Sequence, residues 1–494
     1  MTKLLNKTVS TKIIKFILAA ALLLSLVFLL RIAFYAVPWY DDYSYTQETK
    51  YYLETYGKGP ISAVKGAIST TKGMWWAWQG TFSSIFLMAL CPLAFGESLY
   101  WIGPVFLILI LTVSEIAFGH TLARRVFSMD RDSSWCMGLS MAILSVWRLY
   151  SANSGFYWYN AGVHYVAMHS FMLLFAVVLI CLCDKKSAAD TTLKIIISMI
   201  LALMCSGANS VTALQGLLAV IPIALFAFFV KKRKPFVFIP ATVMYIIGFY
   251  YSVTAYGNTR RAAFFTGTSN SAIMAIIKSF GKALGFLWEF TGVFTIVFIV
   301  LLAPIIWKGL NKVTYKFRLP GILVVLAFSF YATSFTPTLY AIGDSDIGRV
   351  LNAAKLTYQI MLVLSEIYVI GWIKAKVSDT SREIGYVWLY AAGLLVLAAL
   401  FAVSPMERIG YTPYGAYYYV HTGEAEAYHN GYLDMVREIK SQGADVKVVR
   451  NVFKPAYLYA GELSEDPAYE PNAFMAKWYG KNSISVIAEG ENYD

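Results

Sequence analysis

Apolar runs of membrane-spanning length recur along almost the whole chain, and they constrain the fold more than any other feature. A helix that crosses a bilayer needs about 20 mostly apolar residues. Eleven runs approach or reach this length, the shorter ones with help from flanking residues: 16–36, 99–118, 134–147, 163–183, 192–209, 211–230, 236–253, 284–306, 320–336, 356–373 and 385–403. The pattern predicts an all-α polytopic transmembrane bundle whose surrounding partner is the lipid bilayer.

Composition excludes the soluble alternatives. Only 14% of the 494 residues are charged, whereas soluble globular proteins carry about 25%. Because 58% of the residues are hydrophobic, the charges are too few to cover a water-facing surface of this size. We therefore exclude a soluble enzyme, a disordered chain and a fibrous repeat.

Basic residues gather in short clusters between the apolar runs and account for much of the net charge of +12. They form no patch on a soluble face, so we expect no nucleic-acid partner. Short loops rich in Lys and Arg stay on the cytoplasmic side of a membrane. The clusters are Lys3/Lys7/Lys12/Lys15, Arg124/Arg125/Arg131, Lys185/Lys186/Lys194, Lys231/Lys232/Arg233/Lys234, Lys308/Lys312/Lys316/Arg318 and Lys374/Lys376/Arg382.

One further apolar run, 82–93, decides the topology. It is only 12 residues long and contains Pro92. If it crossed the membrane, the cluster at 124–131 would lie outside, whereas a re-entrant or interfacial helix places every basic cluster inside. We predict the second arrangement, with eleven spans, the N-terminus inside and the C-terminal tail outside.

The polar segments poor in Lys and Arg then share the outer side. We expect a transmembrane domain at 1–403, with a first outer loop at 37–80, and a soluble extracytoplasmic tail at 404–494. The tail carries a net charge of −5 and the remainder of the chain +17. Its pattern predicts a small α/β module with a helix over 424–441, a stop at Gly443, and strands at 445–449 and 483–488.

Several enzyme and transporter motifs are missing from the sequence. It lacks the phosphate-gripping loop of ATP-driven pumps, the nucleophile elbow of hydrolases and the His-Glu-x-x-His of zinc proteases. Glu115 and Glu289 are the isolated carboxylates near spans, and they do not form the charged relay that is typical of proton-coupled transporters.

Two adjacent carboxylates, Asp41 and Asp42, follow the first span directly. Like charges this close raise one pKa unless a cation is near, which favours a general base or a ligand for a divalent cation such as Mg²⁺ or Mn²⁺. The alternative is structural, because Asp42 can start a helix that Gly57 would end. Adjacent side chains point in different directions, so one can cap the helix while the other does chemistry.

Aromatic and amide residues recur in the other outer segments. Trp78 belongs to a tryptophan cluster that fits either a membrane anchor or a stacking surface for a sugar ring. Asn160 could hydrogen-bond a sugar hydroxyl, and His164 fits either packing or base chemistry. Asn209 lies in a short link between two spans, where it either closes a tight turn or faces a cavity.

Arginines also stand on the predicted outer side, against the general trend. They are Arg260, Arg261 and Arg349. Because the guanidinium group binds phosphate at two points, these residues are candidate ligands for a lipid phosphate. The alternative for Arg349 is an ion pair with Asp344 or Asp346, which also match a short Asp-x-Asp pattern of nucleotide-sugar transferases.

Together these segments resemble bacterial membrane proteins of the GT-C glycosyltransferase superfamily. The segments that carry the resemblance are Asp41-Asp42-Tyr43-Ser44-Tyr45, Trp78-Gln79-Gly80-Thr81-Phe82, Trp158 to Tyr165, Gly207-Ala208-Asn209, Arg349 and Asn472 to Gly480. Two positions depart from the group, since Thr81 replaces a usual Arg and Ser210 replaces a usual acid.

The resemblance implies a GT-C-like fold in the bacterial cytoplasmic membrane and a sugar transferase active on its outer face. Asp41 or Asp42 would be the base or hold a cation, and Arg349 would neutralise the phosphate of a polyprenyl-phosphate sugar donor. The acceptor would be a cell-envelope glycan. Two alternatives remain at this stage: a flippase or transporter for a lipid-linked sugar, and a glycan polymerase or ligase.

Overall fold

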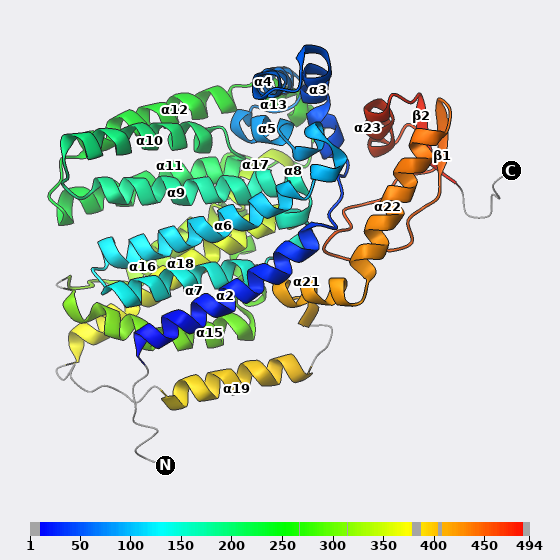
Figure 1. Ribbon diagram of the computed structural model, residues 1–494. Helices are drawn as coiled ribbons and strands as arrows, with labels where there is room; N and C mark the ends of the chain where they lie inside the picture. Colours follow the sequence, from blue (N-terminus) through cyan, green and yellow to red (C-terminus); the bar gives the residue numbers. More distant parts are fainter. Residues whose placement is uncertain (1–9, 266, 314, 378–386, 404–407, 488–494) are drawn as a thin grey trace.

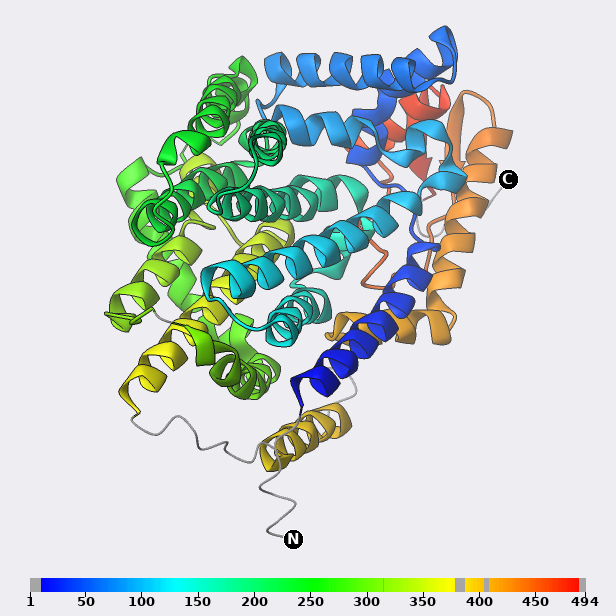
Figure 2. The same cartoon turned by 60° about the vertical axis from the view of Figure 1, so that its left-hand side comes forward.

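The computed structural model describes residues 10–265, 267–313, 315–377, 387–403 and 408–487. Within these ranges, nine helices are long and apolar enough to cross a membrane. Figures 1 and 2 show the long helices packed side by side in one bundle. They lie at Thr11–Ala33, Glu97–Val126, Tyr159–Leu182, Ala188–Ser206, Ser210–Val230, Pro235–Val253, Ala272–Gly309, Pro320–Ile342 and Gly348–Lys376.

Nine of the eleven predicted spans are therefore helices of membrane-crossing length and composition in the described part of the chain. The runs at 134–147 and 385–403 do form helices, α7 (Arg131–Trp147) and α19 (Val387–Val403), each 17 residues long. This length is at the lower limit for a crossing helix. Asp130 caps α7 at its start and the helix ends at Trp147, while residues 378–386, just before α19, lie outside the described residues.

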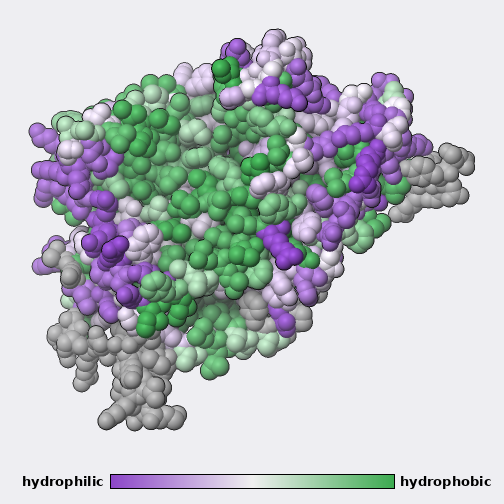
Figure 3. Space-filling model, viewed as in Figure 1, coloured by the Kyte–Doolittle hydropathy of each residue, from purple (hydrophilic) through white to green (hydrophobic). Residues whose placement is uncertain are grey.

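Apolar side chains cover the middle of the bundle surface. Figure 3 shows a broad hydrophobic face between hydrophilic surfaces at the two ends of the molecule. Many large apolar residues point outward, such as Ile17 in α2 (Thr11–Ala33) and Ile247 in α12 (Ile239–Val253), each 60% exposed. Because such exposure is unfavourable in water, the chain is a multi-span helical membrane protein that associates with the lipid bilayer.

The loops that carry basic clusters meet at one end of the bundle. Asp184, after α9 (Met168–Leu182), binds both Arg125 and Lys231, the latter at 3.1 Å. At the same end Lys374, in the last turn of α18 (Gly348–Lys376), donates to the Trp307 carbonyl near the end of α15 (Leu287–Gly309). Because these loops share one end, they agree with the predicted alternation of spans. Three residues of the basic clusters, Lys3, Lys7 and Arg382, lie outside the described residues.

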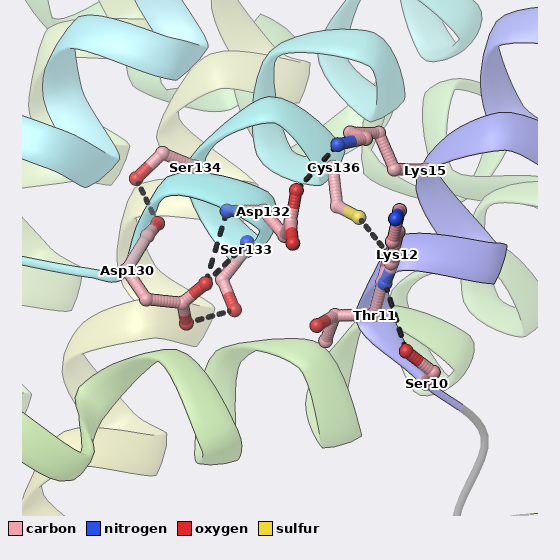
Figure 4. A network of polar contacts seen from close by, with 9 residues as sticks. All are labelled: Ser10, Thr11, Lys12, Lys15, Asp130, Asp132, Ser133, Ser134 and Cys136. Atoms are coloured by element: carbon pink, nitrogen blue, oxygen red, sulfur yellow. Dashed lines mark hydrogen bonds and ion pairs between the residues drawn. The ribbon is translucent and has the colours of Figure 1, made fainter.

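The start of α2 and the start of α7 are tied together at this basic end (Figure 4). Asp130 caps α7 by accepting hydrogen bonds from the backbone N–H groups of Asp132 and Ser133, both at 3.0 Å. Lys15 of α2 forms an ion pair with Asp132. A capped helix start satisfies backbone donors that would otherwise stay unpaired next to the membrane.

A buried acid joins three spans in the interior. Glu115, in α6 (Ile102–Thr121), accepts a hydrogen bond of 2.9 Å from Ser145 of α7 and lies 3.7 Å from Nε2 of His169 in α9. The Glu115 and His169 side chains are 0% and 1% exposed. The sequence position of Glu115 indicated an isolated carboxylate. In the structure Glu115 instead forms part of the contact between α6, α7 and α9.

The end opposite the basic loops holds short helices that do not cross the bundle. They are α3 (Asp41–Tyr56), α4 (Pro60–Ala77), α5 (Phe82–Ala89) and α13 (Tyr256–Ala263). Three further short helices are end portions of spans, namely α8 (Tyr159–Gly162), α14 (Ala272–Gly285) and α17 (Thr336–Ile342). The run at 82–93 contains α5, whose 8 residues extend only about 12 Å. It is too short to cross, in agreement with the prediction.

The remaining spans are joined by tight links. They are α10 (Ala188–Ser206), α11 (Ser210–Leu225) and α16 (Pro320–Ala332). Between α10 and α11, Asn209 caps α11 by accepting a 3.0 Å hydrogen bond from the backbone N–H of Thr212. The Gly207 carbonyl accepts a 3.0 Å hydrogen bond from the backbone N–H of Ser83, which packs this link onto α5.

The C-terminal segment forms the predicted α/β module. It contains α21 (Thr412–His421), α22 (Glu424–Ser441), β1 (Asp445–Val448), α23 (Glu470–Tyr479) and β2 (Ser483–Val486). The two strands pair in parallel, with Asp445 opposite Ser483. The expected helix and both strand positions are confirmed, although each strand ends earlier than predicted and residues 404–407 and 488–494 lie outside the described residues.

The module packs on the segment that follows α2. Tyr43 and Tyr432 share a hydrogen bond of 2.7 Å between their hydroxyl groups, and the Tyr40 hydroxyl donates to Glu470 at 2.5 Å. Lys50 donates to the Trp478 carbonyl at 2.6 Å. Figure 1 shows α22 and α23 beside the end of the bundle that carries α3.

We expect Asp130→Ala to lower the free energy of unfolding by about 1 kcal/mol, because two backbone donors lose their cap. The measurement is thermal and denaturant unfolding of the purified protein in detergent micelles. Asp434→Ala is the matched control, since Asp434 pairs with Arg437 on the exposed face of α22 and such pairs contribute little. Equal destabilisation by both variants would contradict the capping role.

Candidate functional site

The two adjacent aspartates lie in the first turn of α3, where the chain turns sharply after α2. Tyr40 adopts a φ of 41°, which is uncommon for a residue with a side chain and marks a tight reversal. The helix then runs to Tyr56 and ends at Gly57, whose φ is 101°. Gly57 thus ends the helix as predicted, but Asp42 does not start it, because the residue in the capping position is Tyr40.

Asp42 is a buried acceptor for three separate segments. It is 0% exposed. Its Oδ2 accepts hydrogen bonds from the Trp39 N–H at 2.9 Å and the Tyr100 hydroxyl at 2.6 Å, and its Oδ1 accepts one from the Asn160 N–H at 3.1 Å. Burial raises the pKa of Asp42 to about 7, although these donors favour its charged form. Both oxygens of Asp42 are therefore engaged within the protein, where they hold the start of α3 against Tyr100 and Asn160.

Asp41 faces a different environment. Its side chain is partly exposed, and no hydrogen bond to its carboxylate is found among the described residues. Burial raises the pKa of Asp41 to about 6, while Arg349 and Arg261 oppose this rise. A carboxylate with this pKa is largely ionised at neutral pH and still basic enough to accept a proton.

Arg261 and Arg349 come to Asp41 from distant parts of the chain. Both guanidinium groups act electrostatically on Asp41, on the Tyr45 hydroxyl and on the His164 imidazole. These interactions fall off with distance. The predicted acid and two of the three predicted arginines therefore belong to one cluster, at the end of the bundle opposite the basic loops.

Arg261 is held by α13 and by the segment after α4. Its Nη1 donates to Oε1 of Gln79 at 2.6 Å, and its guanidinium lies over the Trp78 ring at 5.2 Å. A Cβ on Gly257 would lie 2.6 Å from the backbone N of both Trp78 and Gln79, so glycine is needed for α13 to approach this closely. Arg260, its neighbour in α13, is exposed and turned away from these contacts.

Arg349 lies in the first turn of α18, with its guanidinium over the Trp158 ring at 5.8 Å. The alternative ion pair with Asp346 is not formed, since Asp346 binds Lys282 at 2.6 Å. Asp344 accepts hydrogen bonds from the backbone N–H groups of Ser345 and Asp346, at 2.7 and 3.0 Å. Among the described residues, Arg349 has no carboxylate within ion-pair distance.

His164 and Asn209 are joined to each other and to α5. The Nδ1 of His164 shares a 2.9 Å hydrogen bond with the Ser84 hydroxyl, and Nδ2 of Asn209 donates to the His164 carbonyl at 2.5 Å. Because the Asn209 oxygen also caps α11, its side chain is engaged within the protein. Of the two predicted roles of Asn209, the structure therefore favours the tight turn. The Asn209 side chain also holds the backbone of His164 in position.

Three buried polar groups around this cluster have no hydrogen-bond partner in the described structure. They are the side-chain amide of Asn160, the Trp158 Nε1 and the Thr81 hydroxyl. Leaving such groups unpaired costs roughly 1–3 kcal/mol each. A ligand with several hydroxyl groups could satisfy them, which is consistent with the predicted role of Asn160.

The predicted divalent-cation site does not fit these residues. In the described ranges, no three His, Cys, Asp or Glu side chains come close enough to hold a metal ion. Both oxygens of Asp42 accept protein hydrogen bonds, and the nearby arginines would repel a cation from Asp41. We therefore derive no step through Mg²⁺ or Mn²⁺.

Two members of the cluster, Tyr45 and Gln79, were not among the predicted site residues. Gln79 bridges the cluster, because its Oε1 accepts from Arg261 and its Nε2 donates to the Tyr45 hydroxyl at 3.4 Å. Both residues lie inside the short motifs that begin at Asp41 and Trp78, so their place in these motifs could have marked them as site residues. What the sequence did not reveal was that these motifs touch.

The chain matches no protein-family model, no curated protein and no solved structure. The resemblance to GT-C enzymes thus remains a prediction from short motifs.

We expect Asp42→Asn to destabilise the protein by about 1–3 kcal/mol, because the amide nitrogen must face a backbone N–H donor in either orientation. Asp41→Asn is the matched control and should leave the free energy of unfolding nearly unchanged. Thermal unfolding of both purified variants in detergent checks this. The same loss of stability in both variants would show that the two carboxylates do not have separate roles.

Proposed function

We propose that this protein is a membrane glycosyltransferase that moves a sugar from a polyprenyl-phosphate donor to a cell-envelope glycan on the extracytoplasmic face. The observation that carries the proposal is the convergence of Asp41 with Arg261 and Arg349. A carboxylate and two guanidinium groups beside a lipid-facing bundle suit a reaction that needs both a base and a phosphate-binding group.

In the proposed reaction Asp41 is the general base. Its carboxylate takes the proton from an acceptor hydroxyl, and the hydroxyl oxygen forms a bond to the anomeric carbon of the donor sugar. The bond between that carbon and the phosphate oxygen breaks, and the polyprenyl phosphate leaves with the bonding electrons. Arg261 and Arg349 stabilise the charge of the leaving phosphate.

The aromatic and amide residues suit recognition of the sugar. Trp78 and Trp158 each hold one arginine over their ring, which orients the guanidinium groups. The unpaired side-chain amide of Asn160 and the Trp158 Nε1 offer hydrogen bonds to sugar hydroxyls. In this proposal the apolar chain of the donor stays among the lipid-facing spans, so the enzyme does not lift it into water.

The orientation that we propose follows the positive-inside rule. The end of the bundle with the basic loops would face the cytoplasm, and the end with Asp41 would face outward. Lipid-phosphate sugars can act there, whereas nucleotide sugars are absent from that side. The C-terminal module beside α3 would then contact the growing glycan.

We expect Asp41→Asn to abolish sugar transfer while leaving donor binding within about twofold, because the amide cannot accept the proton. Transfer would be measured with a radiolabelled polyprenyl-phosphate sugar and an envelope glycan acceptor in proteoliposomes. In the unaltered protein, the rate should fall about tenfold per pH unit below about pH 6, since the base becomes protonated as pH drops through its pKa. Retained translocation of the labelled lipid with no transfer would instead indicate a flippase.

We expect Arg261→Gln to lower kcat by roughly 10²–10³-fold, in the range found when a single charge-stabilising donor is removed. Arg260→Gln should change kcat by less than about twofold, because this adjacent side chain is exposed and exposed charges interact weakly. The same assay checks both variants. An equal loss of kcat in the two variants would show that only the general positive charge of α13 matters. It would contradict a specific contact between Arg261 and the phosphate.

A further inference from the structure

A second pair of cations lies at the same end of the bundle, on another side of α18. Lys355 is only 4% exposed, and Arg148 follows the last turn of α7. Arg148 acts electrostatically on Lys355, and Glu289 is the acid that opposes it. Glu289 itself is exposed and interacts with the Tyr150 hydroxyl.

Neither cation is neutralised by the protein. In the described ranges, Lys355 and Arg148 have no carboxylate within ion-pair distance, and no hydrogen bond from either side chain is found there. An unpaired buried ammonium group is strongly unfavourable, and a second cation beside it adds repulsion. An anion from outside the chain would stabilise the charged form of this pair.

Two backbone segments, at Gly292 and at Ser151, help to position Arg148. Gly292 interrupts the regular geometry of α15 with a φ of 53°, and a Cβ there would lie 2.6 Å from Nη1 of Arg148. Asn352 fixes the segment after Arg148, because its side chain exchanges hydrogen bonds of 3.0 and 2.8 Å with the backbone of Ser151. Arg148 also lies over the Tyr411 ring at 5.8 Å.

The surroundings on the other side of Lys355 are aromatic. Its Nζ lies 5.9 Å from the centre of the Phe290 ring, and Phe290 packs against Phe286, Tyr331 and Tyr358. The neighbouring helix α14 exposes large apolar residues such as Ile273 and Ile277. A ligand with an anionic head and an apolar chain fits both halves of this environment.

This site is separate from the one at Asp41. Arg349 and Lys355 are six residues apart on α18, which places them about 9 Å apart along the axis and on faces roughly 120° apart. Asn352 stands between them and ties α18 to Ser151. We propose that Arg148 and Lys355 form a second anion site, which binds the phosphate headgroup of a lipid, independently of the function proposed above.

The test uses the full-length protein in dodecyl maltoside with both Arg261→Met and Arg349→Met, so that the first cluster no longer binds phosphate. Dodecyl phosphate is the lipid probe and inorganic phosphate is the headgroup alone, with binding measured by calorimetric titration. We expect Lys355→Met and Arg148→Met each to weaken dodecyl phosphate binding by at least about tenfold, as for loss of a charge-assisted hydrogen bond. Lys282→Met is the matched control, because Lys282 is already paired with Asp346.

Equal affinities of the Lys355→Met and Lys282→Met proteins, or no binding of dodecyl phosphate before these changes, would overturn the proposal. Equal binding of inorganic and dodecyl phosphate would overturn the lipid assignment.

Unfolding without ligand gives a second measurement. Lys355→Met should raise the thermal midpoint, since it removes an unpaired buried charge. A lower midpoint would mean that the protein itself satisfies this cation, and would also contradict the site.

Discussion

The buried carboxylate of Asp42 is the contact on which the geometry of the bundle end opposite the basic loops depends. It joins the start of α3 to Tyr100, just before α6, and to Asn160 in α8. Removing a carboxylate from water is costly, and hydrogen bonds to its oxygens offset that cost. Because Asp42 is adjacent to Asp41, this anchor also determines where the second carboxylate lies. The same contact brings Asn160, and with it the neighbouring Trp158, next to the start of α3.

The charges at this end are unevenly balanced. Asp41 is faced by Arg261 and Arg349, and on another side of α18 Lys355 is faced by Arg148. At the first place Glu470 also acts on Asp41, so the acids and arginines balance, whereas at the second place two cations face the single acid Glu289. At a membrane surface, where lipid phosphates are the abundant anions, such an excess favours anionic headgroups as ligands.

Aromatic residues connect these charges to the bilayer. Trp78 and Trp158 hold the two arginines of the first cluster, while Phe290 and Tyr411 contact the cations of the second. Aromatic rings tolerate both a cation on one face and hydrocarbon around their edges. They allow guanidinium and ammonium groups to remain near the lipid-facing spans, where small polar residues could not shield them.

The amino-acid sequence by itself determined the helical runs, their alternation across the bundle, the short α5 and the helix and strands of the C-terminal module. These features follow from local hydropathy and turn residues, which act over a few neighbouring positions. Only the tertiary structure decided that Asp42 is an anchor while Asp41 stays accessible, that Arg261 reaches Gln79, and that Lys355 is buried next to Arg148. These outcomes depend on how helices far apart in the chain pack together, and short-range patterns carry no information about that packing.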